Sequence, residues 1–160
     1  MSAPFIVEPL ADHDLSQFDS GVAQEVQWLL KDASSEMAAR RRATFVAVDR
    51  ANGRVSGAYA LAIRLVHLQG LYLYRQHMVK TYPYVRVAVI NHLHIDTKTG
   101  SPTLGAAMLV NALYRIRRQS EDVRMVILET RQPSHATAFQ SYGFVPDPHD
   151  PMRLFGRLPW

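Results

Sequence analysis

The sequence predicts an α/β (α+β) fold in a single domain that spans residues 1–160. The chain has 160 residues and 48% of them are hydrophobic, which is enough to bury one core. Two β-rich segments around Asn52-Gly53 predict a hairpin in the first half. After residue 84, strand and helix patterns alternate, so a parallel strand pair with a helical crossover is expected there.

The first elements are a short strand and a helix. Phe5 to Val7 is β-rich and Pro9 ends it. From Val22 to about Met37, apolar residues recur at spacings of three and four, which predicts one amphipathic helix with the stripe Val22, Val26, Leu29, Leu30 and Ala33.

The hairpin comes next. Ala43 to Asp49 and Val55 to His67 are both strand-like, and Asn52-Gly53 between them favours a type I′ turn. Gln69 to Pro83 lacks periodicity, so we expect a loop. The longest strand candidate is Tyr84 to Asp96, and Thr97 to Pro102 is turn-like.

The second half continues with a helix, a strand, a short helix and a last strand or hairpin. The first helix is expected over Thr103 to Arg118, with an apolar stripe of Leu104, Met108, Leu109, Ala112, Leu113 and Ile116. Val123 to Glu129 predicts a buried strand, and His135 to Tyr142 a helix that ends at Gly143 in a left-handed cap. Phe144 to Leu158 is the last strand or hairpin.

Composition narrows the function. The chain has no cysteine, which excludes thiol catalysis, thiolate metal sites and disulfides. Met1 to Leu10 has no signal-peptide pattern and Ala58 to Val66 is too short to span a bilayer, so we expect a cytoplasmic protein without membrane contact. The net charge of +4 suits an anionic partner, either a nucleotide cofactor or RNA, or is a mildly basic surface without one.

The segment Thr97 to Thr103 is the first candidate site. Unpaired N–H groups at a helix start, together with the helix dipole, bind anions such as a diphosphate. The alternative is an ordinary strand-to-helix turn with Thr103 as the N-cap, because the segment has a single glycine, Gly100.

His92 and His94 are the second candidate. They alternate on one strand, so their side chains should share a face and serve as a base or as metal ligands. Sequence spacing supplies no acidic residue to complete a ligand set, so we expect no metal; the alternative is two polar residues in a partly open cleft.

Glu129, with Ser134, His135 and Tyr142, is the third candidate. A carboxylate at a strand end can act as a general base through water, and Tyr142 as a general acid. The alternative is a solvated Glu129 and a core Tyr142.

Two clusters of basic residues are the fourth candidate site. They predict RNA contacts or solvated faces, and aromatic residues near Arg75 and Lys80 favour RNA; the clusters are Arg40, Arg41 and Arg42, and Arg115, Arg117 and Arg118.

Several segments together resemble one family. Gln27-Trp28-Leu29, Ile90 to Asp96, Leu104 to Leu109, Gly143 to Pro146 and Asp150 to Leu154 are similar to GNAT N-acetyltransferases, and in particular to the TacT-like toxins of toxin–antitoxin pairs. The resemblance covers nearly the whole chain. It implies the GNAT fold, a central mixed twisted sheet flanked by helices. It also implies acetyl-CoA as donor, the amine of aminoacyl-tRNA as acceptor, a ribbon-helix-helix antitoxin and a homodimer.

The resemblance also implies a set of donor-binding residues. They are the backbone of Leu93, His94 and Ile95, the loop residues Gly100, Ser101 and Thr103, the helix residues Leu104, Gly105 and Ala106, and Gln132. Ser101 and Thr103 replace family glycines, and Pro102 between them removes a backbone donor. The arginine often found in the central strand is His92 here.

A second departure lies before Gly143. Phe139 stands where the family has the tyrosine that acts as general acid toward the leaving thiolate, and a phenyl ring donates no proton. Three readings follow from the resemblance and its departures. The first is an active acetyltransferase with another acid, in which Glu129 or water takes the amine proton, His92 or His94 is the next candidate base and Tyr142 is the candidate acid. The others are a pseudoenzyme that binds protein or RNA, and an acyltransferase with an altered donor or acceptor.

Overall fold

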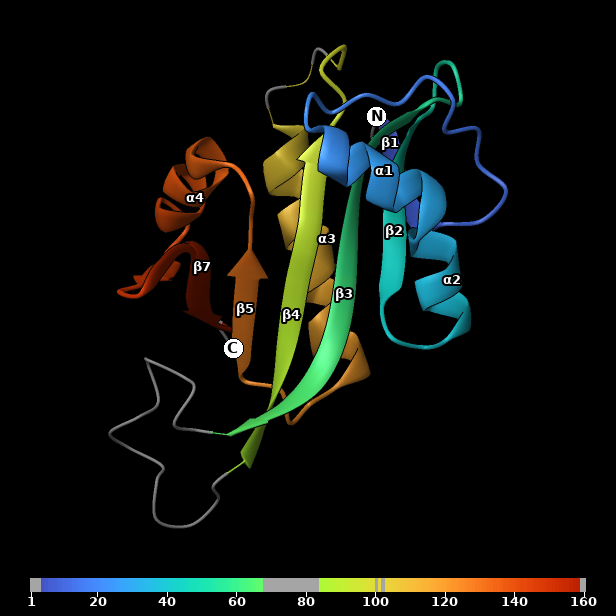
Figure 1. The fold of residues 1–160 in the computed structure, drawn as a ribbon. Coiled ribbons are helices and arrows are strands. Elements are labelled where there is room, and N and C mark those ends of the chain that lie inside the picture. The colour runs from blue at the N-terminus through green and yellow to red at the C-terminus, as the bar shows by residue number, and fades with distance from the viewer. Residues whose placement is uncertain (1–3, 68–83, 100, 102, 159–160) are drawn as a thin grey trace. The chain divides into compact units, whose positions relative to one another are not determined.

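The computed structural model describes residues 4–67, 84–99, 101 and 103–158 (Figure 1). The elements in chain order are β1 (Phe5–Pro9), α1 (Ala23–Lys31), α2 (Ala33–Ala38), β2 (Ala43–Asp49), β3 (Val55–His67), β4 (Tyr84–Ile95), α3 (Leu104–Gln119), β5 (Met125–Glu129), α4 (Pro133–Gln140), β6 (Val145–Asp147) and β7 (Asp150–Arg157).

The seven described strands form a mixed sheet in the order β1-β2-β3-β4-β5-β7-β6. β4 and β5 run parallel, from Val87 opposite Met125 to Ile90 opposite Leu128. The pairs β1–β2, β2–β3, β5–β7 and β6–β7 are antiparallel. This confirms the α/β (α+β) class and the parallel pair predicted after residue 84. Backbone proximity groups the chain into two compact units, residues 1–61 with 92–112 and residues 62–91 with 113–160.

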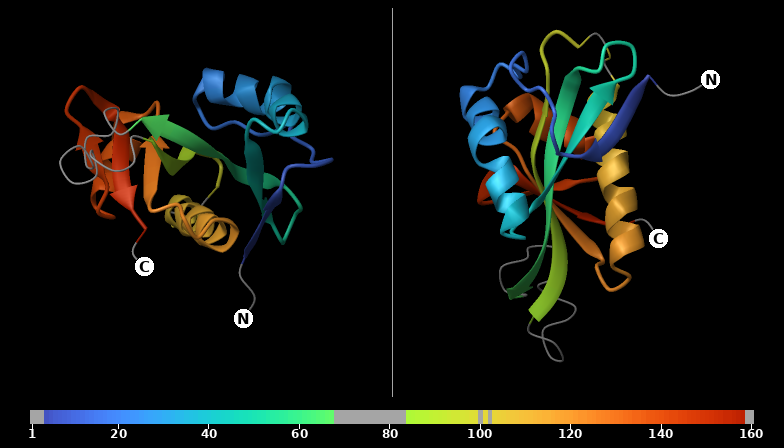
Figure 2. Two further views of the ribbon diagram at one scale, coloured as in Figure 1. Left: turned by 90° about the horizontal axis from the view of Figure 1, so that it is seen from below. Right: turned by 90° about the vertical axis from the view of Figure 1, so that its right-hand side faces the viewer.

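The first unit packs helices on both faces of β2 and β3. In Figure 2, α1 and α2 lie on one face of these strands and the start of α3 on the other. Val46 is opposite Ala58 in the ladder, and both belong to a buried cluster with Trp28 and Leu29 of α1. Strand side chains alternate between faces, so the neighbouring residues of β2 and β3 point the other way.

The α3 face of the first unit depends on a glycine. Gly57 lies opposite Ala47, and a Cβ built on it would be 2.6 Å from Met108 Sδ. Beside it, the Tyr59 hydroxyl donates a 2.7 Å hydrogen bond to Asn111 Oδ1. The missing side chain therefore lets α3 approach β3 closely.

The second unit has its own apolar cluster. Val87 and Val89 of β4, Met125 and Ile127 of β5 and Phe155 of β7 are buried together. The β5–β7 ladder runs from Met125 opposite Arg157 to Glu129 opposite Arg153. Phe155 is opposite Ile127 in that ladder, so the alternating residues of three neighbouring strands supply this core.

The predicted helix over residues 22–37 is wrong in one respect, because the chain forms two helices. Asp32 ends α1 and precedes α2, with φ −111° and ψ −29°, and its N–H donates to the Trp28 carbonyl. Aspartate has low helix propensity, which favours an interruption at this position. One residue of the predicted apolar stripe is also not buried, since Leu30 within α1 is 50% exposed.

The hairpin is confirmed, but the two-residue type I′ turn is not. That turn needs positive φ at both Asn52 and Gly53, and only Gly53, at +71°, has it. Instead, residues 50–54 form a five-residue loop in which the Gly53 N–H donates to the Asp49 carbonyl. The side chains of Asp49 and Asn52 accept the N–H groups of Ala51 and Arg54, which stabilises the longer loop.

The C-terminal predictions are largely confirmed. Gly143 has φ +93°, as expected of a left-handed cap, and the last segment is the β6–β7 hairpin. α4 begins two residues earlier than predicted, at Pro133, a residue suited to the first helical turn.

The predicted loop Gln69 to Pro83 lies outside the described residues. In the part of the chain that the structure describes, no helix combines the length and apolarity needed to span a bilayer.

Candidate functional site

A residue with a positive φ lies in β4 just past the end of the β4–β5 ladder. His92 has φ +55°, an angle that side-chain-bearing residues adopt only at a cost. The last pair of the ladder is Ile90 with Leu128, although β4 continues to Ile95. The backbone of Leu93 to Ile95, which the resemblance assigns to the acyl donor, therefore follows the point where pairing with β5 stops.

The His92 side chain is held on three sides. Its Nδ1 lies 2.6 Å from Glu25 Oε2, its Nε2 lies 2.8 Å from Arg42 Nη1, and its ring stacks on Trp28 with centroids 3.8 Å apart and planes within 1°. A guanidinium only donates hydrogen bonds, so Nε2 accepts from Arg42 and Nδ1 carries the proton that is donated to Glu25. We call Glu25, Trp28, Arg42 and His92 the histidine clamp.

A second carboxylate supports the histidine clamp. Glu36 Oε2 accepts a 3.2 Å hydrogen bond from Trp28 Nε1 and lies 3.8 Å from Arg42 Nε. The His92 and Glu25 side chains are 10% and 8% exposed, so their hydrogen bond is well shielded from water. Charged hydrogen bonds in such surroundings are stronger than those at the surface.

Sequence reasoning did not identify Glu25, Trp28 or Arg42 as partners of His92. A signal was present for one of them. Glu25 lies three residues after Val22 and four before Leu29, within the apolar stripe of the predicted helix. An acidic residue on a buried stripe requires a partner, which His92 provides 67 residues later in the chain.

His94 lies on the same side of β4 as His92, as predicted, because both rings contact Trp28. His94 is only 1% exposed and meets Phe18 edge-on, with centroids 5.0 Å apart. Both histidines are therefore packed against aromatic rings. No group of His, Asp or Glu in the described residues is placed to hold a metal ion.

Asp96 fixes the end of β4. Its Oδ1 accepts the Lys98 N–H at 2.7 Å and its Oδ2 accepts the Asp19 N–H at 3.1 Å. α3 then begins at Leu104, and the Thr103 carbonyl accepts the Ala107 N–H, so Thr103 occupies the predicted N-cap. The predicted loop residue Gly100 lies outside the described residues, as does Pro102.

Two of the predicted loop residues carry hydroxyls that face each other. Ser101 Oγ and Thr103 Oγ1 lie 3.3 Å apart. In the family that the sequence resembles, both positions are glycine, a residue that allows close approach of a ligand to the backbone. Here both positions carry side chains.

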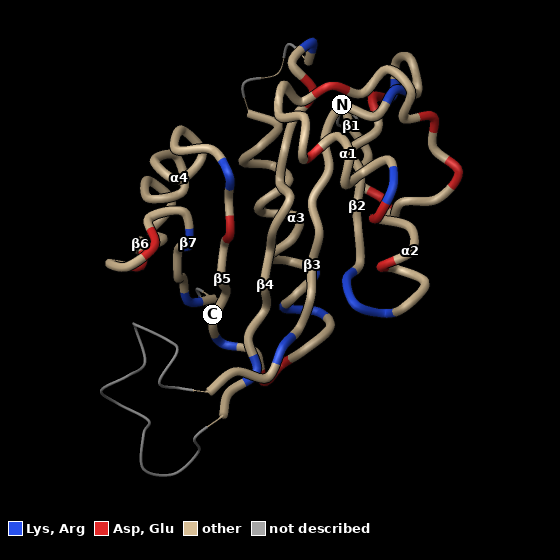
Figure 3. Tube along the Cα trace, viewed as in Figure 1, with Lys and Arg blue, Asp and Glu red and all other residues tan. Residues whose placement is uncertain are grey.

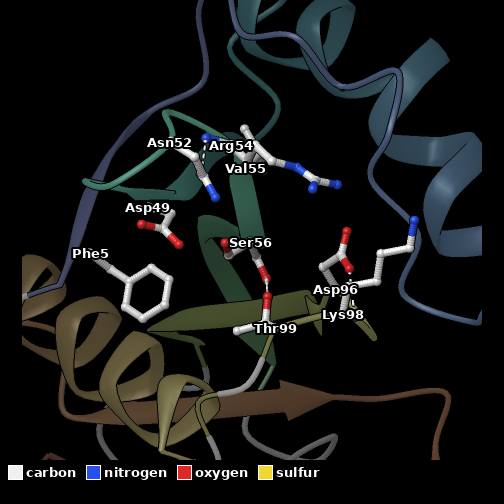
Figure 4. A pocket seen from close by; sticks show the side chains of 9 residues that line it. All are labelled: Phe5, Asp49, Asn52, Arg54, Val55, Ser56, Asp96, Lys98 and Thr99. Carbon is white, nitrogen blue, oxygen red and sulfur yellow. Dashed lines mark hydrogen bonds between the residues drawn. The ribbon is translucent and has the colours of Figure 1, made fainter.

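Described residues at the end of the β2–β3 hairpin line two neighbouring cavities. One has a volume of about 110 Å³ (Figure 4) and is lined by Phe5, Asp49, Asn52, Arg54, Val55, Ser56, Asp96, Lys98 and Thr99. The other, of about 310 Å³, shares Asn52, Arg54 and Val55 with it. Lys98 and Thr99 of the predicted anion-binding segment line the first cavity, whereas none of the other predicted catalytic or donor-binding residues that the structure describes lines either cavity.

The third candidate group lies in the second unit. Glu129 is exposed and stands opposite Arg153 in the β5–β7 ladder. Gln132 precedes α4 and its N–H donates to Thr130 Oγ1 at 3.2 Å. Glu129 is therefore accessible to water, as either of its two interpretations requires.

Of the two aromatic residues near the end of α4, Phe139 is buried and Tyr142 is exposed. Tyr142 is 57% exposed, so the interpretation of this residue as part of the core is wrong. Phe139 is buried, at 6% exposed, and meets His135 edge-on with centroids 6.2 Å apart. Phe139 therefore takes the inward position of this helix, three residues before the exposed tyrosine.

The basic residues divide into engaged and exposed ones. Arg40, Arg41 and Arg42 follow α2 (Figure 3); the first two are exposed, whereas Arg42 belongs to the histidine clamp. Arg118 is exposed and lies over the Tyr114 ring at 5.6 Å, and Arg115 is half-buried. Arg75 and Lys80 lie outside the described residues. By sequence, the second unit has 11 Lys and Arg against 5 Asp and Glu.

Comparison with known proteins finds solved structures of similar fold. No family model matches the sequence. The chain is similar to AtaT in a complex with acetyl-methionyl-tRNAfMet, with a TM-score of 0.82, 18% identity and coverage of 96% of this chain and 94% of that one. It is similar to AtaTR bound with acetyl-CoA, with a TM-score of 0.82, 19% identity and coverage of 97% and 94%.

A third solved structure agrees. A tyrosine-to-phenylalanine mutant of KacT gives a TM-score of 0.81 at 16% identity, with coverage of 98% and 96%. At such low identity these similarities establish the fold. The chain therefore has the GNAT fold, as the sequence resemblance predicted.

Proposed function

We propose that this protein is an N-acetyltransferase that moves an acetyl group from acetyl-CoA to the amine of an aminoacyl-tRNA. The observation that carries the proposal is the φ of +55° at His92, which lies two residues after the end of the β4–β5 ladder and directly before the Leu93–Ile95 backbone. AtaT with an acetylated aminoacyl-tRNA and AtaTR with acetyl-CoA have the same fold and support both substrates.

The residues present fit acetyl-CoA in part. The Leu93 to Ile95 backbone can hydrogen-bond the pantetheine arm, and the N–H groups at the start of α3 can receive the diphosphate. Ser101 and Thr103 carry side chains where the family has glycine, which weakens the diphosphate contact. Loss of one charge-assisted hydrogen bond costs about 1.5–3 kcal/mol, or about ten- to a hundredfold in affinity.

The proposed reaction is direct attack. The amine forms a C–N bond to the thioester carbonyl carbon, the C–S bond breaks, and the thiolate of CoA leaves and takes a proton from water. The N–H groups of Leu93 and His94 polarise the carbonyl, and Glu129 takes the amine proton through water. Phe139 donates no proton, so positioning of the two substrates supplies most of the rate.

The remaining expectations belong to the same proposal. We propose one functional domain over residues 1–160, a cytoplasmic location and a tRNA partner. An antitoxin of the ribbon-helix-helix type and a homodimer follow from the resemblance, and structures of AtaT with the antitoxin AtaR support a protein inhibitor.

Two observations favour a second function. Buried Phe139 at the family's tyrosine position and hydroxyls at two glycine positions are what a catalytically impaired binding module would have. The test is transfer of labelled acetyl from acetyl-CoA to aminoacyl-tRNA, with deacylated tRNA as the control. Labelled acetyl on the aminoacyl-tRNA, with none on the deacylated tRNA, supports the enzyme. Binding of acetyl-CoA or tRNA without transfer supports the binding module, and transfer from a different acyl-CoA supports an altered donor.

A further inference from the structure

We infer that His92 acts through its backbone, as a positioning residue held in the left-handed conformation by Glu25, Arg42 and Trp28. This inference rests on the proposed function, because it assigns the clamp to the acyl-donor strand. The sequence suggested that His92 is a general base, whereas the inference assigns it the positioning of the backbone.

The first step concerns the ring nitrogens. Nδ1 is committed to Glu25 at 2.6 Å and Nε2 accepts from Arg42 at 2.8 Å. A general base needs an unoccupied lone pair within reach of the proton it removes. His92 has its lone pair directed at a guanidinium, so it is not arranged to accept a proton from a substrate amine.

The second step concerns the backbone. A residue with a side chain at φ +55° is strained unless its surroundings fix that conformation. Two hydrogen bonds, one of them to a buried carboxylate, and a parallel stack on Trp28 are such surroundings. The clamp uses residues from α1 and from the segment after α2 to fix one torsion in β4.

The third step connects this torsion to the donor. Ladder pairing with β5 ends at Ile90, two residues before His92, and Leu93 to Ile95 follow. β5 ends at Glu129, one position past the last ladder pair, so Leu93 to Ile95 have no β5 residue opposite them. The torsion of His92 then sets the direction in which their N–H and C=O groups point, and the clamp fixes that torsion.

The test compares substitutions that differ in their tolerance of positive φ. Glycine adopts it without cost, alanine and valine do not. We expect His92→Gly to bind acetyl-CoA within about threefold of the natural chain, and His92→Ala and His92→Val to bind at least about tenfold more weakly. His149→Gly, at an exposed loop position, is the matched control and should leave affinity unchanged.

A second readout needs no acetyl-CoA. At an ordinary strand position, a protein with glycine is less stable than the same protein with alanine. At a position with positive φ, the protein with glycine is the more stable one. We expect a higher urea midpoint for His92→Gly than for His92→Ala. Equal loss of affinity in the glycine and valine variants, or a lower midpoint for glycine, would overturn the inference. A natural chain that binds no acetyl-CoA contradicts the proposed function instead, and the midpoints then decide on the clamp alone.

Discussion

Gly57 of β3 and Met108 of α3 lie in direct contact, with room for a hydrogen atom and none for a methyl group. A Cβ on Gly57 would be 2.6 Å from Met108 Sδ and 2.9 Å from Ile95 Cδ1. We predict that Gly57→Ala lowers the free energy of unfolding by about 1–3 kcal/mol, the usual cost of overpacking a core. Urea unfolding measures it.

Two variants complete the Gly57 test. Gly105→Ala is the matched control, because its nearest neighbour would be 4.0 Å away and alanine favours a helix, so stability should be unchanged or higher. Adding Met108→Val to Gly57→Ala should restore part of the loss by shortening the obstructing side chain. A Gly57→Ala variant as stable as the natural chain would show that α3 does not pack this closely.

Phe139 offers a test of the missing general acid. We predict that Phe139→Tyr raises acetyl transfer, by as much as the roughly 10²–10⁴-fold that general acid catalysis contributes. The ring is buried in α4, and the resemblance aligns it with the family's tyrosine, so the added hydroxyl should be held in place. Single-turnover transfer to aminoacyl-tRNA measures the effect.

The control for Phe139 is Tyr142→Phe. Tyr142 is 57% exposed, so removal of its hydroxyl should leave the rate unchanged. If Phe139→Tyr shows no gain while Tyr142→Phe loses activity, the exposed tyrosine is the acid and the assignment of Phe139 fails.

The two hydroxyls before α3 predict the strength of donor binding. Ser101→Gly with Thr103→Gly restores both family glycines and removes the pair of oxygens 3.3 Å apart. We expect acetyl-CoA affinity to rise about tenfold, the equivalent of about 1.4 kcal/mol. Ser101→Ala is the control, because it keeps a Cβ and should give no gain. Calorimetry distinguishes the variants, and equal affinities would show that these side chains do not obstruct the donor.

Arg41 and Arg42 are neighbours with different predicted effects. Arg41 is exposed, so Arg41→Gln should weaken RNA binding and reduce the slope of log affinity against log salt by about 1. Arg42 bonds His92 and lies near Glu36, so Arg42→Gln should lower the free energy of unfolding by about 1–3 kcal/mol. A salt slope that changes with Arg42 and not with Arg41 would reverse these roles.

The sequence identified most strands and helices because their apolar periodicity matches their burial. The stripe of α3 is an example: Leu104, Met108, Leu109, Ala112 and Ile116 are all buried. The break at Asp32 and the five-residue hairpin loop were not predicted. Both depend on local backbone hydrogen bonds, and the pattern of apolar residues does not indicate these bonds.

The candidate site was harder to predict. The alternation of His92 and His94 placed both on one face correctly, but gave no indication that His92 reverses its φ or that Glu25 is its partner. Such contacts join residues 50 and 67 positions apart and depend on tertiary packing. Spacing along one element contains no information about them, whereas the resemblance to a family indicated the strand but not the clamp.

Calorimetric titration of the purified chain with acetyl-CoA tests the central claim most directly. The proposed acetyltransferase predicts saturable binding with a Kd in the micromolar range, tightened by the restored glycines at positions 101 and 103. Absence of binding at millimolar acetyl-CoA would contradict it.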